Sequence, residues 1–107
     1  MLLLKPGVRI AGLRPEILFA IVAAERVCAG MGVDCVVTAC VDGVHQAGSL
    51  HYCGLAVDLR SRDFRPGDVD KAIARIRQCL GADYDVVLEN DHVHLEYQPK
   101  KPLSREN

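Results

Sequence analysis

The segment from Pro66 to Leu80 carries the clearest helical pattern in the chain. Its apolar residues recur at i, i+3, i+4, i+7 and i+11, spacings that fall on one face of a helix: Val69, Ala72, Ile73, Ile76 and Leu80. Proline suits the first turn of a helix, and Gly81 suits its end. The segment is therefore predicted to be an amphipathic helix of a globular domain.

A second helix is predicted from Pro15 to Ala29, with Gly30 at its end and Glu16 in its first turn. Apolar residues cover most of its circumference, so we expect it to be largely buried. Leu2–Ile10 can form an edge segment, interrupted by Pro6–Gly7. Strands are predicted where short segments are β-branched or alternate in polarity, at Asp34–Ala39, Leu55–Leu59, Asp85–Glu89 and His92–Tyr97.

These elements predict an α+β fold with a small, mostly antiparallel sheet and two main helices, because strands and helices do not alternate regularly. The 107 residues fit a single domain spanning residues 1–107. Half of the residues are apolar and 25% are charged, which is an ordinary composition for a soluble globular protein. The tail Gln98–Asn107 is rich in charge and contains two prolines, so we expect it to be frayed.

Charge and hydropathy restrict the partners. The net charge is −1 and the longest basic run is Lys100–Lys101, which argues against a nucleic-acid-binding protein. The longest apolar run, Ile17–Ala24, is too short to span a membrane. The apolar start Met1–Leu4 is too short for a secretory signal, so we expect synthesis in the cytoplasm.

The chain has five cysteines but no CxxC pair, which excludes a zinc-finger or thioredoxin motif. We expect the cysteines to be small buried residues in a reducing compartment. Their number and spacing leave open whether one or two disulfides form.

The histidines suggest where the chemistry lies. In the strand predicted at His92–Tyr97, alternation places His92 and His94 on one face. Asp58 lies on the strand face opposite its apolar neighbours, and Gly54 can supply the kink that lets His51 converge with it. Two imidazoles and one carboxylate, with a fourth position left to water, are typical of catalytic zinc. Taken alone, the same residues also fit a simple His–Asp hydrogen bond or exposed histidines.

Two motifs extend this pattern. Ser49–Asp58 fits S-x-H-x-x-G-x-A-x-D, and Asp91–His94 fits both D-x-x-H and H-x-H. The chain resembles the family of zinc D-Ala-D-Ala carboxypeptidases and L-alanyl-D-glutamate endopeptidases. It is most similar to the short phage and prophage members, which cleave peptidoglycan stem peptides, and the resemblance covers about Asp34 to Tyr97. It implies the Hedgehog/DD-peptidase type of single-domain fold.

The resemblance also implies roles for individual residues. It makes His51, Asp58 and His94 the ligands of one zinc ion per chain, and gives Asp91 the place of the catalytic carboxylate. Asp91 must then lie at the entrance of the last strand, because alternation separates it from the face of His94. Ser49 corresponds to a residue close to the peptide or carboxylate of the substrate, and His92 to a group that either supports a metal ligand or faces the substrate.

One part of the family pattern is missing. Members usually carry an arginine shortly before the first motif, where it stabilises the oxyanion, but residues 38–45 contain none. His45, Arg60 and Arg62 are the candidates to replace it. Two glutamates offer further roles: Glu89 is an alternative base, and Glu96 shares the face of His92 and His94 and could orient an imidazole.

The leading hypothesis is a monomeric zinc-dependent peptidase that hydrolyses peptidoglycan stem peptides, with a carboxylate as general base. A phage lysis enzyme of this kind would act at the cell wall. The first alternative is a weak or inactive zinc-binding module on the same fold. A thiol hydrolase that uses Cys53 or Cys40 with His92 is the second. A non-haem Fe(II) oxygenase is the third, although it needs a larger β scaffold.

Overall fold

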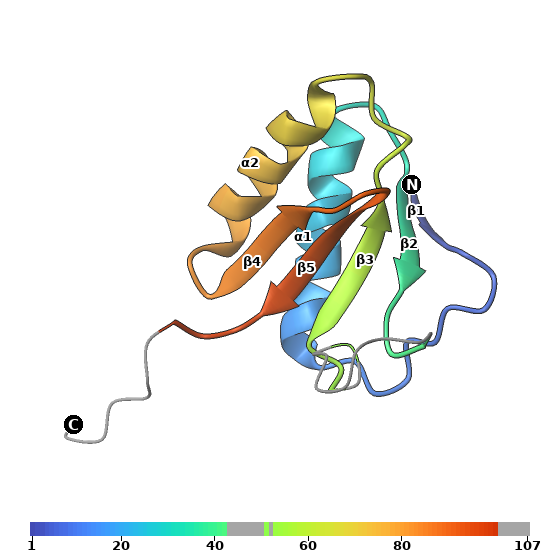
Figure 1. Cartoon of the computed structure of the whole chain (residues 1–107), viewed down its shortest axis with the longest axis vertical. Coiled ribbons are helices and arrows are strands. Elements are labelled where there is room, and N and C mark those ends of the chain that lie inside the picture. The colour runs from blue at the N-terminus through green and yellow to red at the C-terminus, as the bar shows by residue number, and fades with distance from the viewer. Residues whose placement is uncertain (43–50, 52, 101–107) are drawn as a thin grey trace.

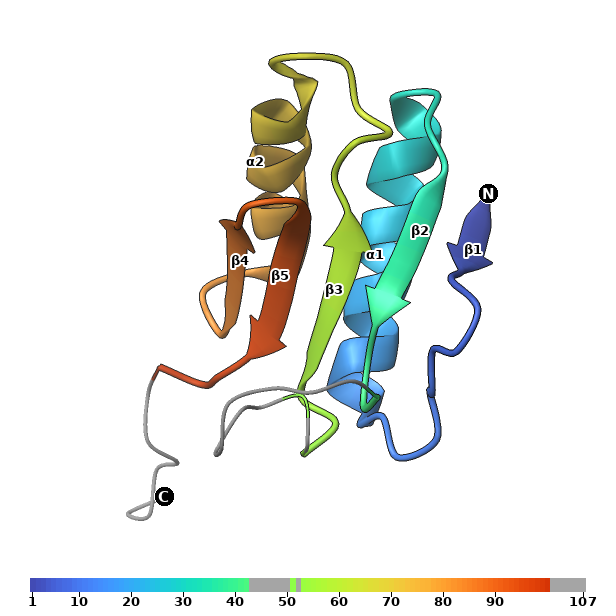
Figure 2. The same cartoon turned by 45° about the vertical axis from the view of Figure 1, so that its right-hand side comes forward.

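A five-stranded mixed sheet forms one layer of the fold and two helices form the other (Figures 1 and 2). The computed structural model describes residues 1–42, 51 and 53–100. The α+β prediction is confirmed. In chain order, the elements are β1 (Leu2–Leu4), α1 (Pro15–Gly30), β2 (Cys35–Ala39), β3 (Ala56–Arg60), α2 (Asp68–Leu80), β4 (Tyr84–Leu88) and β5 (His92–Tyr97).

The strands are ordered β1-β2-β3-β5-β4. β1 pairs with β2 in parallel, and every other pair in the sheet is antiparallel. β3 and β5 are far apart in the sequence but adjacent in the sheet, and Asp58 lies directly opposite His94. Two of the three expected metal ligands are therefore brought together by strand pairing alone.

The core lies between the sheet and the two helices. The sheet residues that face the helices include Val57 and Leu59 of β3 and Val93 and Leu95 of β5, all buried. Strand alternation then places Asp58, Arg60, His92, His94 and Glu96 on the opposite face. Neither helix covers this second face (Figures 1 and 2), which we call the helix-free face.

The helix predicted at Pro15–Ala29 forms, but the expectation that it is largely buried was wrong for one of its faces. Ile17, Ala20, Ile21 and Ala24 pack into the core, whereas the side of the helix that points away from the sheet is exposed. That side carries three large apolar residues, Leu18, Phe19 and Val22. A sheet covers only one side of a helix, so α1 is buried only on that side even though apolar residues cover most of its circumference.

The cysteines are also divided between buried and exposed positions. Cys28, Cys35 and Cys40 are buried, as expected, but Cys53 and Cys79 are exposed, so the expectation of burial was wrong for these two. All five are free thiols in the structure. Within the part of the chain that the structure describes, no helix is long and apolar enough to cross a membrane.

Candidate metal centre

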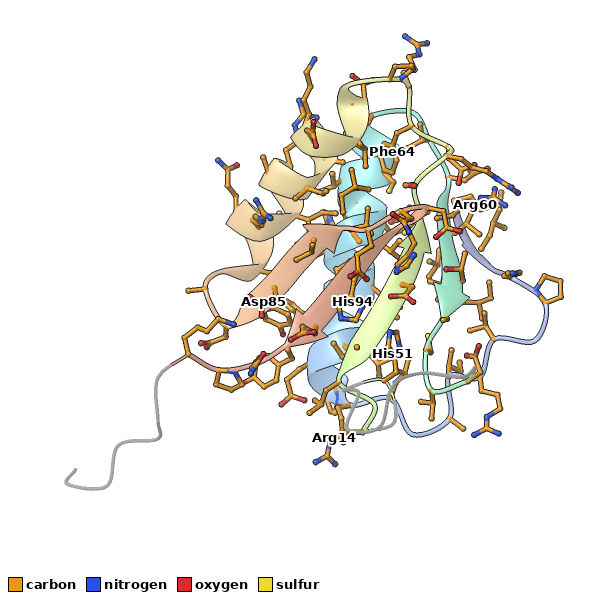
Figure 3. The ribbon with its side chains drawn as sticks, viewed as in Figure 1. Arg14, His51, Arg60, Phe64, Asp85 and His94 are labelled. Carbon is orange, nitrogen blue, oxygen red and sulfur yellow. The ribbon has the colours of Figure 1, made fainter. Side chains whose placement is uncertain are left out.

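Three potential metal ligands meet on the helix-free face of the sheet. Asp58 lies in the middle of β3, His94 lies opposite it on β5, and His51 lies in the turn that precedes β3. One nitrogen from each imidazole and one oxygen of the carboxylate all lie within 4.8 Å of one another. The side chains of His51 and His94 extend from the near side of the sheet in Figure 3, and their ring centroids are 5.1 Å apart. We call these three residues the metal cluster.

The carboxylate of Asp58 is the centre of the cluster. Its Oδ1 lies 2.9 Å from His94 Nδ1 and 3.3 Å from His51 Nε2. His92 Nε2 lies farther away, at 3.8 Å from the same oxygen. Asp58 and His51 are both buried, with relative exposures of 8% and 3%. A buried carboxylate needs cationic or hydrogen-bonding partners, and here the imidazoles supply them.

The outer nitrogen of each ligand imidazole has its own acceptor. His51 Nδ1–H donates to the carbonyl oxygen of Cys40 at 2.8 Å, and His94 Nε2–H donates to Glu96 Oε1 at 2.8 Å. This hydrogen bond supports the expected role of Glu96 in orienting an imidazole. Because the outer nitrogens hold these protons, the inner nitrogens of the neutral rings present lone pairs to Asp58.

Lone pairs that face a carboxylate repel it unless a cation lies between them. A proton on the imidazole meets this need, and so does a metal ion bound by all three groups. Nitrogen donors with one carboxylate are typical of Zn²⁺ and of other first-row transition metals, whereas Ca²⁺ and Mg²⁺ prefer oxygen ligands. The donor set of the cluster therefore fits a transition-metal ion.

The titration of the cluster reflects the same contacts in the absence of metal. Burial raises the pKa of Asp58, but hydrogen bonds from His51 and His94 outweigh it and hold that pKa well below its ordinary value. The hydrogen bond with Asp58 is the main cause that raises the pKa of His94 to about 9, and the bond with Glu96 adds to it. The metal-free cluster thus holds a proton at neutral pH, and a bound metal ion would replace it.

Gly54 allows His51 to reach the cluster. Its φ is +74°, a left-handed conformation that favours glycine, and its N–H donates to the carbonyl of His51 in the turn before β3. A Cβ at this position would collide with the backbone carbonyl oxygen of Gly12. The sequence-based expectation of a kink at Gly54 is therefore confirmed, and the close approach of Gly12 adds a second reason for glycine.

An irregularity in β2 positions the acceptor for His51. The register between β2 and β3 shifts between Val37 and Ala39, which is a β-bulge with Thr38 as the extra residue. The Thr38 hydroxyl donates to the backbone carbonyl of Asp58 at 3.4 Å. Just after the bulge, Cys40 presents its carbonyl to His51. The sequence analysis missed this contact, because a backbone acceptor leaves no mark on residue identity.

Asp91 lies at the entrance of β5, immediately before its first residue, as the D-x-x-H motif requires. Its side chain is 91% exposed, and its Oδ1 accepts a hydrogen bond from His92 Nδ1 at 2.8 Å. On the other side of the ring, His92 Nε2 lies 3.1 Å from Glu89 Oε1. Asp91 thus contacts His92 and lies outside the metal cluster, and its catalytic role stays a prediction.

The titration of Asp91 and His92 is linked. The hydrogen bond from His92 holds the pKa of Asp91 below its ordinary value. Burial lowers the pKa of His92, but its bond with Asp91 and the charges of Asp58 and Glu89 outweigh burial, so the pKa of His92 is raised. The pair therefore favours an ionised Asp91 beside a protonated His92.

The structure gives different results for the other residues that the sequence suggested for substrate binding or catalysis. His45 and Ser49 lie outside the described residues. Arg60 forms a two-pronged ion pair with Asp63, with both N–O distances at 2.9 Å, so its guanidinium is already engaged. Burial raises the pKa of the Cys40 thiol to about 12, which makes it a poor nucleophile for a thiol hydrolase.

The sequence matches no model of a known protein family, and no curated protein matches it significantly.

Proposed function

We propose that the chain is a zinc-dependent peptidase that hydrolyses peptide bonds in peptidoglycan stem peptides. The observation that carries the proposal is the convergence of His51, Asp58 and His94 within 4.8 Å. Two imidazole nitrogens and one carboxylate oxygen are a donor set of catalytic zinc sites. These residues also occupy the ligand positions of the two motifs that resemble the zinc peptidase family.

When bound, zinc polarises a substrate carbonyl and lowers the pKa of water to about 7. The protein residues have separate tasks. His51, Asp58 and His94 hold the ion, while the Cys40 carbonyl and Glu96 fix the orientation of the two rings.

Asp91 is the proposed general base. A base must be ionised at the working pH, and the hydrogen bond from His92 favours this form of Asp91. Its exposed carboxylate is accessible to a substrate and to water. Glu89, which contacts the opposite edge of the His92 ring, is the competing candidate for the same role.

His92 is the proposed stabiliser of the negative charge that develops on the scissile carbonyl. It lies between Glu89 and Asp91, its pKa is raised, and Nε2 is 3.8 Å from the central oxygen of the metal cluster. A protonated imidazole at this position supplies the positive charge that the absent arginine would provide. Under this proposal, the chain works as a monomer at the cell wall.

A zinc-binding module without catalysis is the second candidate function. It is favoured by the exposure of Asp91 and by its contact with His92 rather than with the metal cluster. Such a module would need the metal for stability alone.

The experiment that separates the two candidates uses purified peptidoglycan and defined muropeptides, with released fragments identified by mass spectrometry. We expect Asp91→Asn to retain about one zinc per chain by elemental analysis and to lose hydrolysis, because the base is removed and the ligands remain. Glu89→Gln is the matched control and should retain hydrolysis. Loss of activity in Glu89→Gln alone would reassign the base, and an inert zinc-loaded wild type would leave the module as the function.

A further inference from the structure

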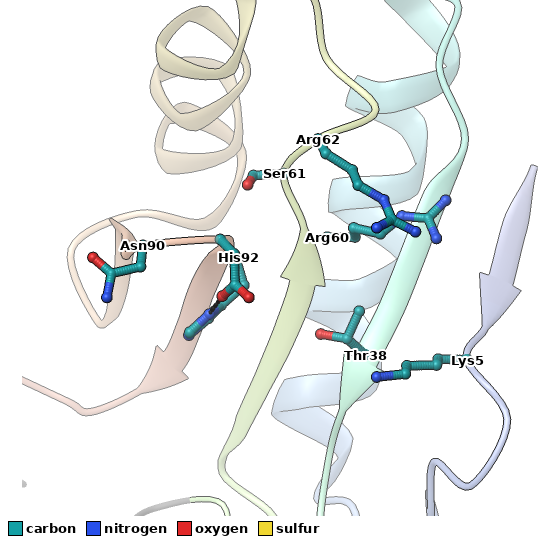
Figure 4. A pocket seen from close by; sticks show the side chains of 8 residues that line it. Lys5, Thr38, Arg60, Ser61, Arg62, Asn90 and His92 are labelled. Atoms are coloured by element: carbon teal, nitrogen blue, oxygen red, sulfur yellow. Dashed lines mark hydrogen bonds and ion pairs between the residues drawn. The ribbon is translucent and has the colours of Figure 1, made fainter.

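A cavity of about 640 Å³ lies beside the metal cluster (Figure 4). The three metal ligands do not line it, so it is a separate feature of the helix-free face. Its lining combines residues from β2, β3 and β5 and from the connections that follow β1 and β3 and precede β5, including Lys5, Thr38, Arg60, Arg62, Asp91 and His92.

The sheet register fixes where the cavity lies relative to the cluster. Arg60 and His92 are paired across β3 and β5, two residues along each strand from the Asp58–His94 pair. Two residues of a strand span about 6.6 Å, and alternation keeps both pairs on the same face. The two pairs are therefore about 6.6 Å apart along the strands at the backbone, while the His92 side chain, which lines the cavity, brings its Nε2 to 3.8 Å from Asp58 Oδ1.

Two cations of the cavity have no partner among the residues that the structure describes. Among the described residues, neither the Lys5 ammonium nor the Arg62 guanidinium makes a hydrogen bond or an ion pair. The other charges are compensated, because Arg60 pairs with Asp63 and the Asp91 carboxylate accepts from His92. The arginine side chains extend from the end of β3 over β2, and Lys5 extends toward Thr38 (Figure 4). Within the described part of the chain, one side of the cavity thus has an uncompensated positive charge.

We propose that this cavity binds a carboxylate of the peptide substrate. The proposal rests on the peptidase function proposed above and names the part of the substrate that the site would recognise. The Arg60–His92 pair lies about 6.6 Å along the strands from the Asp58–His94 pair, and an extended peptide advances about 3.3 Å per residue, so a peptide bound at the cluster can place a nearby carboxylate in the cavity. Arg62 supplies a planar fork suited to a carboxylate, and Lys5 supplies a second charge.

The test measures binding rather than turnover, so that it does not depend on hydrolysis. Two synthetic stem peptides carry a reduced, uncleavable central bond and differ only in a C-terminal carboxylate or carboxamide. Calorimetric titration into the zinc-loaded full chain is expected to show about tenfold tighter binding of the carboxylate peptide, as for a charge-assisted hydrogen bond. Arg62→Gln and Lys5→Gln should each reduce this preference severalfold without changing zinc content. Arg65→Gln, in the same connection but outside the cavity lining, is the matched control and should keep the full preference.

The outcomes separate this proposal from the proposed function. Equal binding of the two peptides, or a preference that survives in both cavity variants, overturns the carboxylate site even if hydrolysis is found. A preference that the cavity variants remove supports the site, even if no peptide bond is ever cut and the peptidase proposal falls. If inorganic phosphate displaces the carboxylate peptide at a lower concentration than the peptide itself requires, the cavity is a phosphate site and the carboxylate assignment is wrong.

Discussion

Glu96 is the residue whose replacement tests the metal cluster most cleanly. Its Oε1 accepts a hydrogen bond from His94 Nε2 at 2.8 Å, on the side of the ring away from Asp58. In Glu96→Gln, the amide oxygen can still accept this bond. The substitution therefore removes one negative charge while it keeps the shape and the orientation of the imidazole.

The size of the effect follows from the distance across the ring. A metal ion bound to His94 Nδ1 would lie on the order of 6 Å from the Glu96 carboxylate. A divalent cation and a unit charge at that distance attract by about 1.4 kcal/mol at the dielectric constant of water and by about 5.5 kcal/mol at an effective value of 20. The Glu96 side chain is 20% exposed, so an intermediate value applies. We expect zinc affinity to fall about 30-fold, or about 2 kcal/mol, within the range typical for carboxylates that support a ligand histidine.

The assay is a zinc titration in competition with a chromophoric chelator, which gives the dissociation constant of each variant. Asp85→Asn is the matched control, because Asp85 lies opposite Glu96 on β4 and its carboxylate binds Lys100 instead of an imidazole. Its zinc affinity should stay within twofold of the wild type. Unchanged affinity in Glu96→Gln would refute the reasoning, and an equal loss in both variants would assign the effect to the general field of the sheet.

Four further predictions concern the same site. In His51→Ala, elemental analysis should find no bound zinc, and zinc at 100 times the wild-type Kd should stabilise only the wild type, by about 2.7 kcal/mol. Zinc affinity should rise with pH by up to tenfold per unit between pH 6.5 and 9. The reason is that the pKa of His94 is raised to about 9, so zinc must displace its proton below that pH. A flat pH profile of the affinity, measured by competition titration, would show that no proton is displaced. The same raised pKa stabilises the metal-free fold below pH 6.5, and this contribution is lost as the pH rises through about 9. Gly54→Ala should lower the free energy of unfolding, measured by chemical denaturation, by more than about 3 kcal/mol. The control Gly32→Ala has the same φ of +74° but lies in open space, and should lower it by about 1–2 kcal/mol. Equal losses of stability in the two variants would mean that the contact with Gly12 relaxes.

The fold was largely predictable because most of its determinants are local. Local sequence patterns located β2 to β5 and both helices to within a few residues, but the edge segment predicted at Leu2–Ile10 forms a strand only at Leu2–Leu4. The exposed apolar residues of α1, such as Phe19, were not predictable, since the face that meets the sheet is chosen by tertiary packing. The parallel pairing of β1 likewise depends on partners distant in the sequence.

The metal cluster could also be predicted in its main features. Strand alternation selected Asp58 and His94, and Gly54 indicated how His51 reaches them. The supporting contacts were less accessible. From the sequence, Glu96 could either orient an imidazole or be exposed on the face that it shares with His92 and His94, so its hydrogen bond with His94 was only one of two possibilities. The carbonyl of Cys40 has no signal in the sequence. The role of Asp91 stays a prediction, because its position beside His92 fits more than one function.

Because of the bulge at Thr38, the orientation of the metal-ligand candidate His51 depends on the number of residues in β2. Successive carbonyls of a strand point in opposite directions, so deletion of one residue there would turn the Cys40 carbonyl away from the ring of His51. His51 would then lose the acceptor that keeps its proton on Nδ1, and the other tautomer, with a proton pointing into the cluster, would become equally accessible. Sequence variation in β2 is thus constrained in length more tightly than in side-chain identity, and a variant shortened by one residue would need a new acceptor before it could bind metal as well.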